Sequence, residues 1–376
     1  MVSTGRPVSD RTIVVTSVGT SLLTNVAEGP ERGSLLRCTN LGADELTDEQ
    51  DALVEDLRAR AAARLAAADP GECIRASAEL AVLTPLLRTL RSGRVTHWLV
   101  HSDTAPGAVA AGLLADQLAD TNATVQRVQI KHLRTTSVAD FQRGATELAR
   151  WCTDTLPGHR YAGDRVVFNV AGGFKSLSGY LQTIGMFYAD ETIYTFEGTG
   201  ELLTIPQLPV TLTVDDAQFE LLRRVHLGIG QAEELAAGLP HSLIEQAEEL
   251  IDLSAFGQVL WERAGPAGRY RDRLLDPPDA RVRFGERLRA SVSDIREPGR
   301  LQQLNQRVDD LVRYVDSNGR YNPARLDVKK LAGIPKPGST HEFDAWSDGA
   351  AARGFIHFED GVHGRHLVID EIGTHL

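Results

Sequence analysis

A glycine turn with one lysine is the stretch of this sequence best suited to binding an anion. Residues 168–182 read FNVAGGFKSLSGYLQ, which predicts a buried strand end, a turn and an amphipathic helix. Gly172 and Gly173 would let the backbone approach a ligand, the first amides of the helix carry partial positive charge, and Lys175 adds a full charge. Because such turns also serve packing alone, this stretch by itself leaves phosphate binding and plain packing both open.

The elements that must position this turn form an alternating pattern. Strand-like runs rich in β-branched residues occur at 11–18, 95–101, 123–130, 165–170 and 191–196, with helical patterns between most of them. This alternation predicts an α/β Rossmann-like domain, with a mainly parallel sheet and helices on both faces.

Two more polar turns follow expected strands. Gly19-Thr20-Ser21 comes after the first strand, and Ser102-Asp103-Thr104 comes after the second. Since ligands bind beyond the carboxyl ends of parallel strands, we expect all three turns on one rim. The first turn alone is also explained as a strand exit or a helix cap. The fingerprint GxGxxG is absent after the first strand, which disfavours an NAD or FAD enzyme.

Composition and charge narrow the class of protein. With 376 residues, of which 42% are hydrophobic, the chain is long enough for two or three domains. Its net charge of −11 disfavours general nucleic-acid coating and leaves a local basic site open. The three scattered cysteines fit a reducing compartment and predict no zinc or disulfide framework. Lacking a signal-peptide core and a long apolar run, the sequence predicts a cytoplasmic protein without a membrane partner.

The second half of the chain predicts two further segments. Residues 213–298 carry helical patterns, including one at 243–253, and end in a stretch rich in proline, glycine and arginine. We expect a mainly helical connector there. Residues 299–376 combine one amphipathic helix with three strand-like runs joined by hairpin-like turns, which predicts a small α+β domain with an antiparallel sheet.

The first segment, residues 1–212, resembles the CARF family, the CRISPR-associated Rossmann-fold sensors of cyclic oligoadenylate. The resemblance rests on the order and spacing of TSVGTSLLTN (16–25), HSDT (101–104) and NVAGGFKSLSGYLQ (169–182). It implies a homodimer that binds one ring across both rims, with cyclic tetra-adenylate as the first expectation and cyclic hexa-adenylate as the second. The ligand contacts that it implies are Thr20, Ser21, Gly172, Gly173, Lys175 and Ser176, followed by Asp103 and Thr104.

The last segment looks like a RelE/ParE-type toxin domain, a family whose RelE members cut messenger RNA in the ribosomal A site. The resemblance is carried by LDVKKLAG (326–333), THEFDAW (340–346), RGFIHFEDG (353–361) and HLVIDEIGTHL (366–376). Arg353 matches the arginine of the family's second strand, and the Lys329-Lys330 pair matches its lysines before the sheet. The first strand departs from the family because Glu342 and Asp344 replace lysines, and His375 replaces a final arginine.

Metal-free RNA cleavage requires a base for the 2′-OH, an acid for the leaving 5′ oxygen, and cations for the developing charge. Five of the eleven histidines follow residue 340, and Arg353 and His357 share one face of a strand. We expect phosphate stabilisation by Arg353, proton transfer by His357 and His375 with His341 in reserve, and RNA binding by Lys329 and Lys330. His357 is equally open as a plain strand residue, whereas His363 and His366 are expected at the surface. No HExxH-like spacing is present, so we expect no metal.

Together these resemblances imply a type III CRISPR ancillary effector. Cyclic oligoadenylate would activate a metal-independent mRNA endoribonuclease, which is expected to depend on the ribosome and to inhibit translation. One alternative is a CARF-type transcription regulator that carries a helix-turn-helix within residues 214–297. Another is a nucleotide-metabolising α/β enzyme that uses Lys175 and Ser21, and slow cleavage of a bound ring stays open as well.

Overall fold

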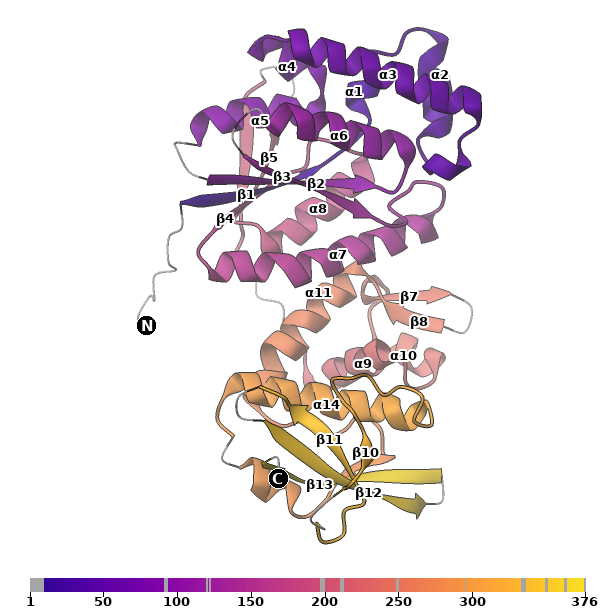
Figure 1. The fold of residues 1–376 in the computed structure, drawn as a ribbon, viewed down its shortest axis with the longest axis vertical. Coiled ribbons are helices and arrows are strands. Elements are labelled where there is room, and N and C mark those ends of the chain that lie inside the picture. The colour runs from indigo at the N-terminus through magenta and orange to yellow at the C-terminus, as the bar shows by residue number, and fades with distance from the viewer. Residues whose placement is uncertain are drawn as a thin grey trace. The chain divides into compact units, whose positions relative to one another are not determined.

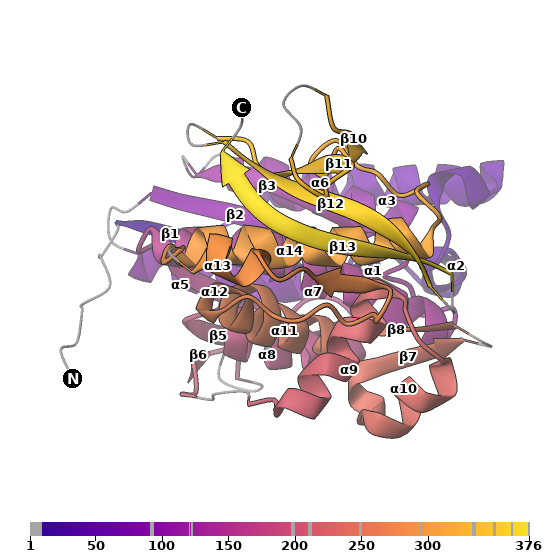
Figure 2. The same cartoon turned by 90° about the horizontal axis from the view of Figure 1, so that it is seen from below.

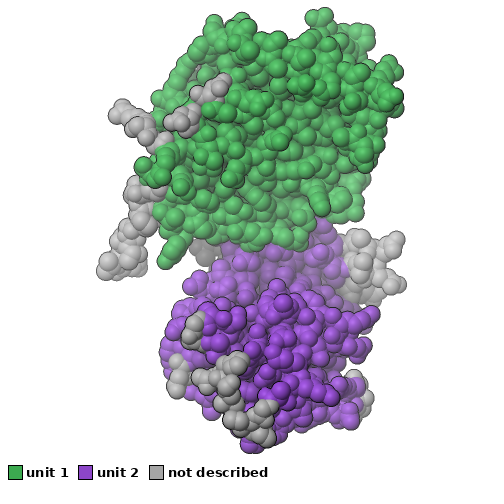
Figure 3. Space-filling model, viewed as in Figure 1, with its two compact units in different colours: residues 1–211 green, residues 212–376 purple. Residues whose placement is uncertain are grey.

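The computed structural model describes residues 10–90, 94–119, 121, 123–196, 200–209, 213–247, 250–293, 295–332, 336–348, 351–361 and 364–374. They belong to two units, Met1–Thr211 and Leu212–Leu376 (Figure 3). The sequence predicted three segments, but residues of the expected connector share a hydrophobic core with the last segment.

A six-stranded sheet in the order β3-β2-β1-β4-β5-β6 forms the centre of the first unit. Five strands are parallel, and β6 runs antiparallel to β5, so the predicted mainly parallel α/β sheet is confirmed. The strands are β1 (Arg11–Ser17), β2 (Arg94–Ser102), β3 (Thr124–Ile130), β4 (Arg165–Asn169), β5 (Glu191–Thr195) and β6 (Leu202–Pro206). The chain proceeds outward from β1 to β3 and then returns to β4, on the other side of β1. The carboxyl ends of β1 and β4 therefore form a topological switch point.

Helices cover both faces of this sheet (Figure 1). One face carries α5 (Ala78–Thr89) and α6 (Ala105–Ala119), with α1 (Ser21–Thr24), α2 (Pro30–Cys38), η1 (Ala43–Glu45), α3 (Asp48–Ala67) and α4 (Pro70–Ala76) beyond them; the other carries α7 (Val138–Tyr161) and α8 (Lys175–Tyr188). Buried leucines of α3, α5 and α6 pack with Val14 and Leu99 of the sheet. Within the described part of the chain, no helix is long and apolar enough to cross a membrane.

The chain from Pro70 to Thr89 forms two helices, α4 and α5, that meet at Ser77. Ser77 has extended backbone angles, and its hydroxyl caps α5 by accepting a hydrogen bond from the Leu80 amide at 3.1 Å. This break places the start of α5, including Glu79, beneath the turn that follows β1. At the start of α3, Thr47 and Gln50 form a reciprocal capping box.

The second unit begins with a cluster of helices and a short hairpin. Its elements are α9 (Asp216–Leu227), α10 (Ala232–Gly238), η2 (His241–Leu243), β7 (Ile244–Ala247), β8 (Leu250–Leu253), α11 (Ala255–Ala264), the π-helical turn η3 (Gly265–Arg269) and α12 (Tyr270–Asp272). The helix expected at 243–253 is wrong, because this segment forms the hairpin β7–β8. Ile244 and Leu253 pair directly, and both are buried in a core with Trp261. Strand pairing thus buries side chains whose spacing also suits a helix.

A five-stranded sheet in the order β10-β11-β12-β13-β9 completes the second unit (Figure 2). Its strands are β9 (Val282–Phe284), β10 (Lys329–Lys330), β11 (His341–Trp346), β12 (Ala352–Gly361) and β13 (Gly364–Thr374), and its helices are α13 (Leu288–Val292) and α14 (Pro298–Asp316). Strands β10 to β13 are antiparallel; the sequence predicted β11 to β13, and β10 is an additional short strand. β9 pairs in parallel with β13, so the sheet already includes residues of the expected connector. Leu304 and Val308 of α14 pack with Phe343 and Ile356 on one face of the sheet.

Candidate functional site

A pocket of about 380 Å³ opens at the switch point of the first unit, beyond the carboxyl ends of β1, β2 and β4. Its wall combines hydroxyl groups, side-chain amides, glycines and a few apolar side chains. The residues that line it are Val18, Gly19, Thr20, Ser21, Thr24, Asn25, Thr39, Asn40, Ala78, Ser102, Thr104, Gly107, Leu133, Thr135, Ala171, Gly172, Gly173, Phe174 and Leu177. Of the predicted ligand contacts, the structure thus brings together Thr20, Ser21, Thr104, Gly172 and Gly173.

The turns after β1 and β4 touch each other at the floor of this pocket. A Cβ atom on Gly19 would lie 2.5 Å from the Gly173 nitrogen, and one on Gly172 would lie 2.6 Å from Glu79 Cδ. The Ser17 hydroxyl holds the two turns together by donating a hydrogen bond to the Gly172 carbonyl at 2.7 Å. Glycine is therefore required at Gly19 and Gly172 by protein packing. The prediction that Gly172 lets a ligand approach the backbone is not needed to explain this glycine.

A buried carboxylate, that of Glu79, supports the turn after β1. It is fully buried, and it accepts hydrogen bonds from the Gly19 amide at 2.7 Å and from the Ser21 hydroxyl at 2.8 Å. Ser21 Oγ also accepts a hydrogen bond from the Ala78 amide at 3.3 Å. The hydroxyl of Ser21, a predicted ligand contact, is therefore hydrogen-bonded to residues of α5. Sequence reasoning missed Glu79, although a single acid among Ala78, Leu80 and their apolar neighbours was an available signal.

The amino-terminal end of α8 borders the same pocket. Phe174 and Leu177 line the pocket, and no side chain caps the helix at Phe174. Lys175 and Ser176 are exposed in the first helical turn but are not among the residues that line the pocket. Uncapped amides and one lysine make this end of the helix attractive to an anion. The turn before it requires glycine at Gly173, whose φ is +85°.

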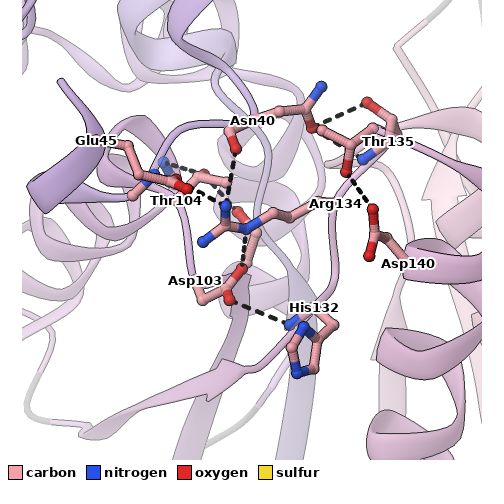
Figure 4. A network of polar contacts seen from close by, with 12 residues as sticks. Asn40, Glu45, Asp103, Thr104, His132, Arg134, Thr135 and Asp140 are labelled. Carbon is pink, nitrogen blue, oxygen red and sulfur yellow. Dashed lines mark hydrogen bonds and ion pairs between the residues drawn. The ribbon is translucent and has the colours of Figure 1, made fainter.

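A polar network holds one wall of the pocket (Figure 4). The Asp103 carboxylate accepts hydrogen bonds from Arg134 Nε at 2.8 Å and from the His132 amide at 3.1 Å. Burial opposes the charge of Asp103, but these bonds lower the pKa of Asp103 below its usual value. Arg134 also donates to Glu45 at 2.8 Å and to the Asn40 carbonyl at 3.2 Å. Asp103 therefore holds Arg134 in place and is absent from the pocket lining.

Two residues of this wall were missed from sequence. Asn40 Oδ1 accepts a hydrogen bond from the Thr135 amide at 2.8 Å, and both residues line the pocket. They come from the segments after α2 and β3, where the sequence offers no motif. Thr104, a predicted contact, lines the pocket and accepts a bond from the Gly107 amide at 3.3 Å at the start of α6.

In the second unit, the predicted phosphate-stabilising arginine has a carboxylate partner. Arg353 on β12 pairs with Asp344, which lies directly opposite on β11. Each of these side chains is 17% exposed. The acid of β11 thus neutralises the arginine of β12.

His357 shares the face of Arg353 and also lies between acids. Its Nδ1 bonds Asp370 at 2.9 Å, and its Nε2 contacts Glu359 at 3.2 Å. Although burial favours the neutral ring, these two carboxylates raise the pKa of His357 above its ordinary value. Ser339 orients Asp370 by donating a hydrogen bond at 2.7 Å. The pair of His357 and Asp370 has the chemistry of an oriented proton donor.

His341 lies on the opposite face of the sheet, so the structure does not bring it together with His357. His341 is paired with Ile356, while Glu342 is paired with Phe355 and therefore faces the side of His357. The His341 ring meets the Phe358 ring edge-on at 4.9 Å. Burial, followed by the nearby charges of Arg365 and Lys330, lowers the pKa of His341.

The remaining predicted residues of this segment are separated. Lys329 pairs with Asp327 at 2.5 Å, whereas Lys330 is exposed at the next position of β10 and points to the other face. His375 and His363 lie outside the described residues. His366, expected at the surface, is only 6% exposed, because it packs against the glycine backbone at Gly361. Among the described residues, no group of three or more His, Cys, Asp or Glu side chains could hold a metal ion.

Comparison with known proteins adds one similarity. Residues 74–208 match a family described as CRISPR-associated protein (Cas_APE2256). The matched range includes α5, the turn with Gly172 and the start of α8, but β1 and the Gly19 turn precede it. No curated protein matches the chain. The part of the chain that supplies strands β2 to β6 and the turn after β4 is therefore similar to a CRISPR-associated family.

Proposed function

We propose that this chain is an ancillary effector of type III CRISPR systems that is switched on by cyclic oligoadenylate and cuts RNA. The observation that carries the proposal is the pocket at the switch point between β1 and β4, bordered by the uncapped start of α8, whose first turn carries Lys175. The similarity of residues 74–208 to a CRISPR-associated family supports the same assignment.

The chemistry of the pocket suits a nucleotide ring. Hydroxyl and amide groups of Thr20, Asn25 and Asn40 offer hydrogen bonds to ribose and adenine, while Phe174 and Leu177 supply apolar contact. The start of α8 and Lys175 favour phosphate. The nearby Glu79 charge is shielded, because the Gly19 amide and the Ser21 hydroxyl bind its two oxygens. Two copies of the chain would share one ring, with cyclic tetra-adenylate as the first candidate and cyclic hexa-adenylate as the second.

RNA cleavage is assigned to the second unit, without a metal. His357, held by Asp370, would give a proton to the leaving oxygen, and Arg353 would contact the phosphate on the same face. Arg353 must then exchange Asp344 for the RNA phosphate. This exchange offers a physical basis for a resting state with little activity. The expected substrate is messenger RNA on the ribosome.

A transcription regulator is the second candidate, and one observation favours it. Helices α9 and α10 precede the hairpin β7–β8, an order that resembles a helix-turn-helix followed by a wing. However, residues 232–253 contain six Asp and Glu residues and no Lys or Arg. Because DNA phosphates repel such a segment, we favour the nuclease.

The test adds cyclic tetra-adenylate or cyclic hexa-adenylate to the full chain, with naked RNA and with translating ribosomes. We expect ligand-dependent cleavage that Arg353→Ala abolishes while ligand binding persists. Lys175→Ala should lose the ligand response, whereas Arg58→Ala, an exposed change on α3, serves as the control. Ligand-dependent operator binding without RNA cleavage would show that the regulator is the correct assignment.

A further inference from the structure

A second pocket, of about 220 Å³, lies in the second unit beside the carboxyl end of α14 and strands β12 and β13. It combines aromatic rings with arginines, and it is on the face of the sheet that carries His341. The side chains that matter here are Arg281, Tyr314, Asn318, Phe358 and Arg365. None of the expected nuclease residues that the structure describes lines this pocket.

The two arginines of this pocket differ in their partners. Arg281 is neutralised by Asp279 at 2.6 Å and by Asp316 at 2.7 Å. Arg365 instead lies over the Phe358 ring, with Cζ 3.9 Å from the ring centroid. Within the described part of the chain, Arg365 has no carboxylate at ion-pair distance. Its planar group is therefore both stacked and available to an anion.

Further positive charge lies close by. Lys330 is exposed on β10, opposite His341, and the charges of Arg365 and Lys330 both act on the His341 ring. That ring in turn packs against Phe358. Arg365, Lys330 and the His341 imidazole therefore lie on the pocket's face of the sheet, where Asp360 of β12 is the residue opposite Arg365.

The opposite face of the same sheet has a different balance. Its cations are paired with acids: Arg353 with Asp344 and Lys336 with Glu371. An RNA phosphate that approaches that face must displace a carboxylate. At the pocket, by contrast, Arg365 could bind an RNA phosphate without breaking an ion pair to any carboxylate that the structure describes.

We propose that this pocket binds one nucleotide of single-stranded RNA, with the base against the planar Arg365 and Tyr314 side chains and a phosphate near Arg365 and Lys330. Guanidinium and aromatic planes stack on any base, and arginine adds hydrogen bonds to phosphate. With a volume of about 220 Å³, the pocket is too small for a duplex. This inference rests on the proposal that the second unit acts on RNA, and it adds a subsite that holds the strand apart from the Arg353 face.

The test measures fluorescence anisotropy of a fluorescein-labelled, 2′-O-methylated oligonucleotide of about ten bases, a probe that cannot be cut, with the full chain at about 50 and 200 mM salt. Arg365→Gln should weaken binding about tenfold and lower the slope of log K against log salt by about 0.7. Arg365→Lys should keep the salt slope but bind more weakly than the wild type, because lysine keeps the charge and loses the plane.

The matched control is Arg289→Gln. Arg289 is also an exposed arginine near a phenylalanine, with Cζ 6.0 Å from the Phe284 ring centroid, but it pairs with Asp276. It should bind like the wild type. Tyr314→Leu removes the aromatic ring that is the second planar group for the base, and it should also weaken RNA binding. Thermal melting establishes that each variant is folded.

No detectable binding by the wild type would overturn the subsite, as would equal affinities for Arg365→Gln and Arg289→Gln. These outcomes differ from a failure of the proposed function. If ligand-stimulated cleavage occurs and Arg365→Gln leaves binding unchanged, the subsite is wrong and the nuclease stands. If binding depends on Arg365 but no activator elicits cleavage, the subsite stands and the nuclease assignment is wrong.

Discussion

The contact between the two rim turns predicts a severe effect of Gly172→Ala. Gly172 is buried between Glu79 and β1, and an added Cβ would lie 2.6 Å from Glu79 Cδ, with Glu79 Oε1 and the Ser17 carbonyl oxygen still closer. Neither neighbour can move away from the added methyl group easily, because Ser17 O belongs to the backbone of the central strand β1 and Glu79 is fully buried. The φ angle of Gly172 is not positive, so this change tests packing alone.

The expected loss of stability has two parts. Overpacking of a filled interior costs about 1–3 kcal/mol. If Glu79 moves aside, the Gly19 amide loses its hydrogen-bond acceptor, which adds about 1–3 kcal/mol. Gly172→Ala should therefore lower the free energy of unfolding of the first unit by about 2–6 kcal/mol. Binding of cyclic tetra-adenylate should also weaken, since both turns line the pocket.

Gly179→Ala is the matched control in the same segment. Gly179 lies within α8, and an added Cβ would meet no atom within 4 Å. Alanine should stabilise this helix by about 0.5–1 kcal/mol. Urea-dependent hydrogen exchange, read by mass spectrometry on peptides of β1 and β4, gives the stability of the first unit for both variants. Equal protection in Gly172→Ala and the wild type would refute the argument that these turns are packed without spare room.

Three further predictions concern buried polar groups. Glu79→Ala should destabilise the first unit by about 2–4 kcal/mol in the same exchange assay, and Glu79→Gln by less than half of that, because glutamine still accepts the Gly19 amide. Burial lowers the pKa of His97 from 6.5 to about 4, so between these values the unfolded chain binds a proton that the folded unit excludes. Stability should then fall by about 3 kcal/mol as the pH falls through this window, and a urea titration of His97→Phe should lack this component. A double-mutant cycle of Arg353→Gln and Asp344→Asn, measured by thermal unfolding, should show a coupling of about 1–3 kcal/mol; additive effects would contradict the ion pair.

Much of the first unit could be predicted from local patterns. Its central strands are continuous apolar runs, and strand ends on one side of a parallel sheet must share a rim. That reasoning correctly brought Thr20 and Gly173 to one pocket. It could have singled out Glu79 as an acid among apolar neighbours, but it could not find the partners of this residue, which are an amide and a hydroxyl about 60 residues earlier in the chain. The partners of a buried acid depend on tertiary contacts, which no local spacing encodes.

The second unit shows where local reasoning reached its limit. β9 has only three residues, and its existence depends on parallel pairing with β13, which lies far along the chain. The segment 243–253 has apolar spacing that suits a helix or a hairpin, and pairing of Ile244 with Leu253 decides between them. The alternation of side chains along a strand places Arg353 and His357 on one face, and this could be predicted from sequence. The position of His341 on the other face depends on the register between β11 and β12, which the sequence does not show.

The acids of β11 have a physical consequence for how RNA could meet this sheet in the proposed nuclease. Glu342 and Asp344 place two negative charges on the face that carries Arg353. Arg353 compensates one of these acids. The face that carries Arg353 and His357 therefore keeps an excess of carboxylates, and it attracts RNA weakly until Asp344 is displaced. Arg365 and Lys330 keep positive charge on the opposite side, so the sheet would hold a strand with one face and react with it on the other. A strand that passes around the edge at β10, the outermost strand of the sheet, satisfies both conditions.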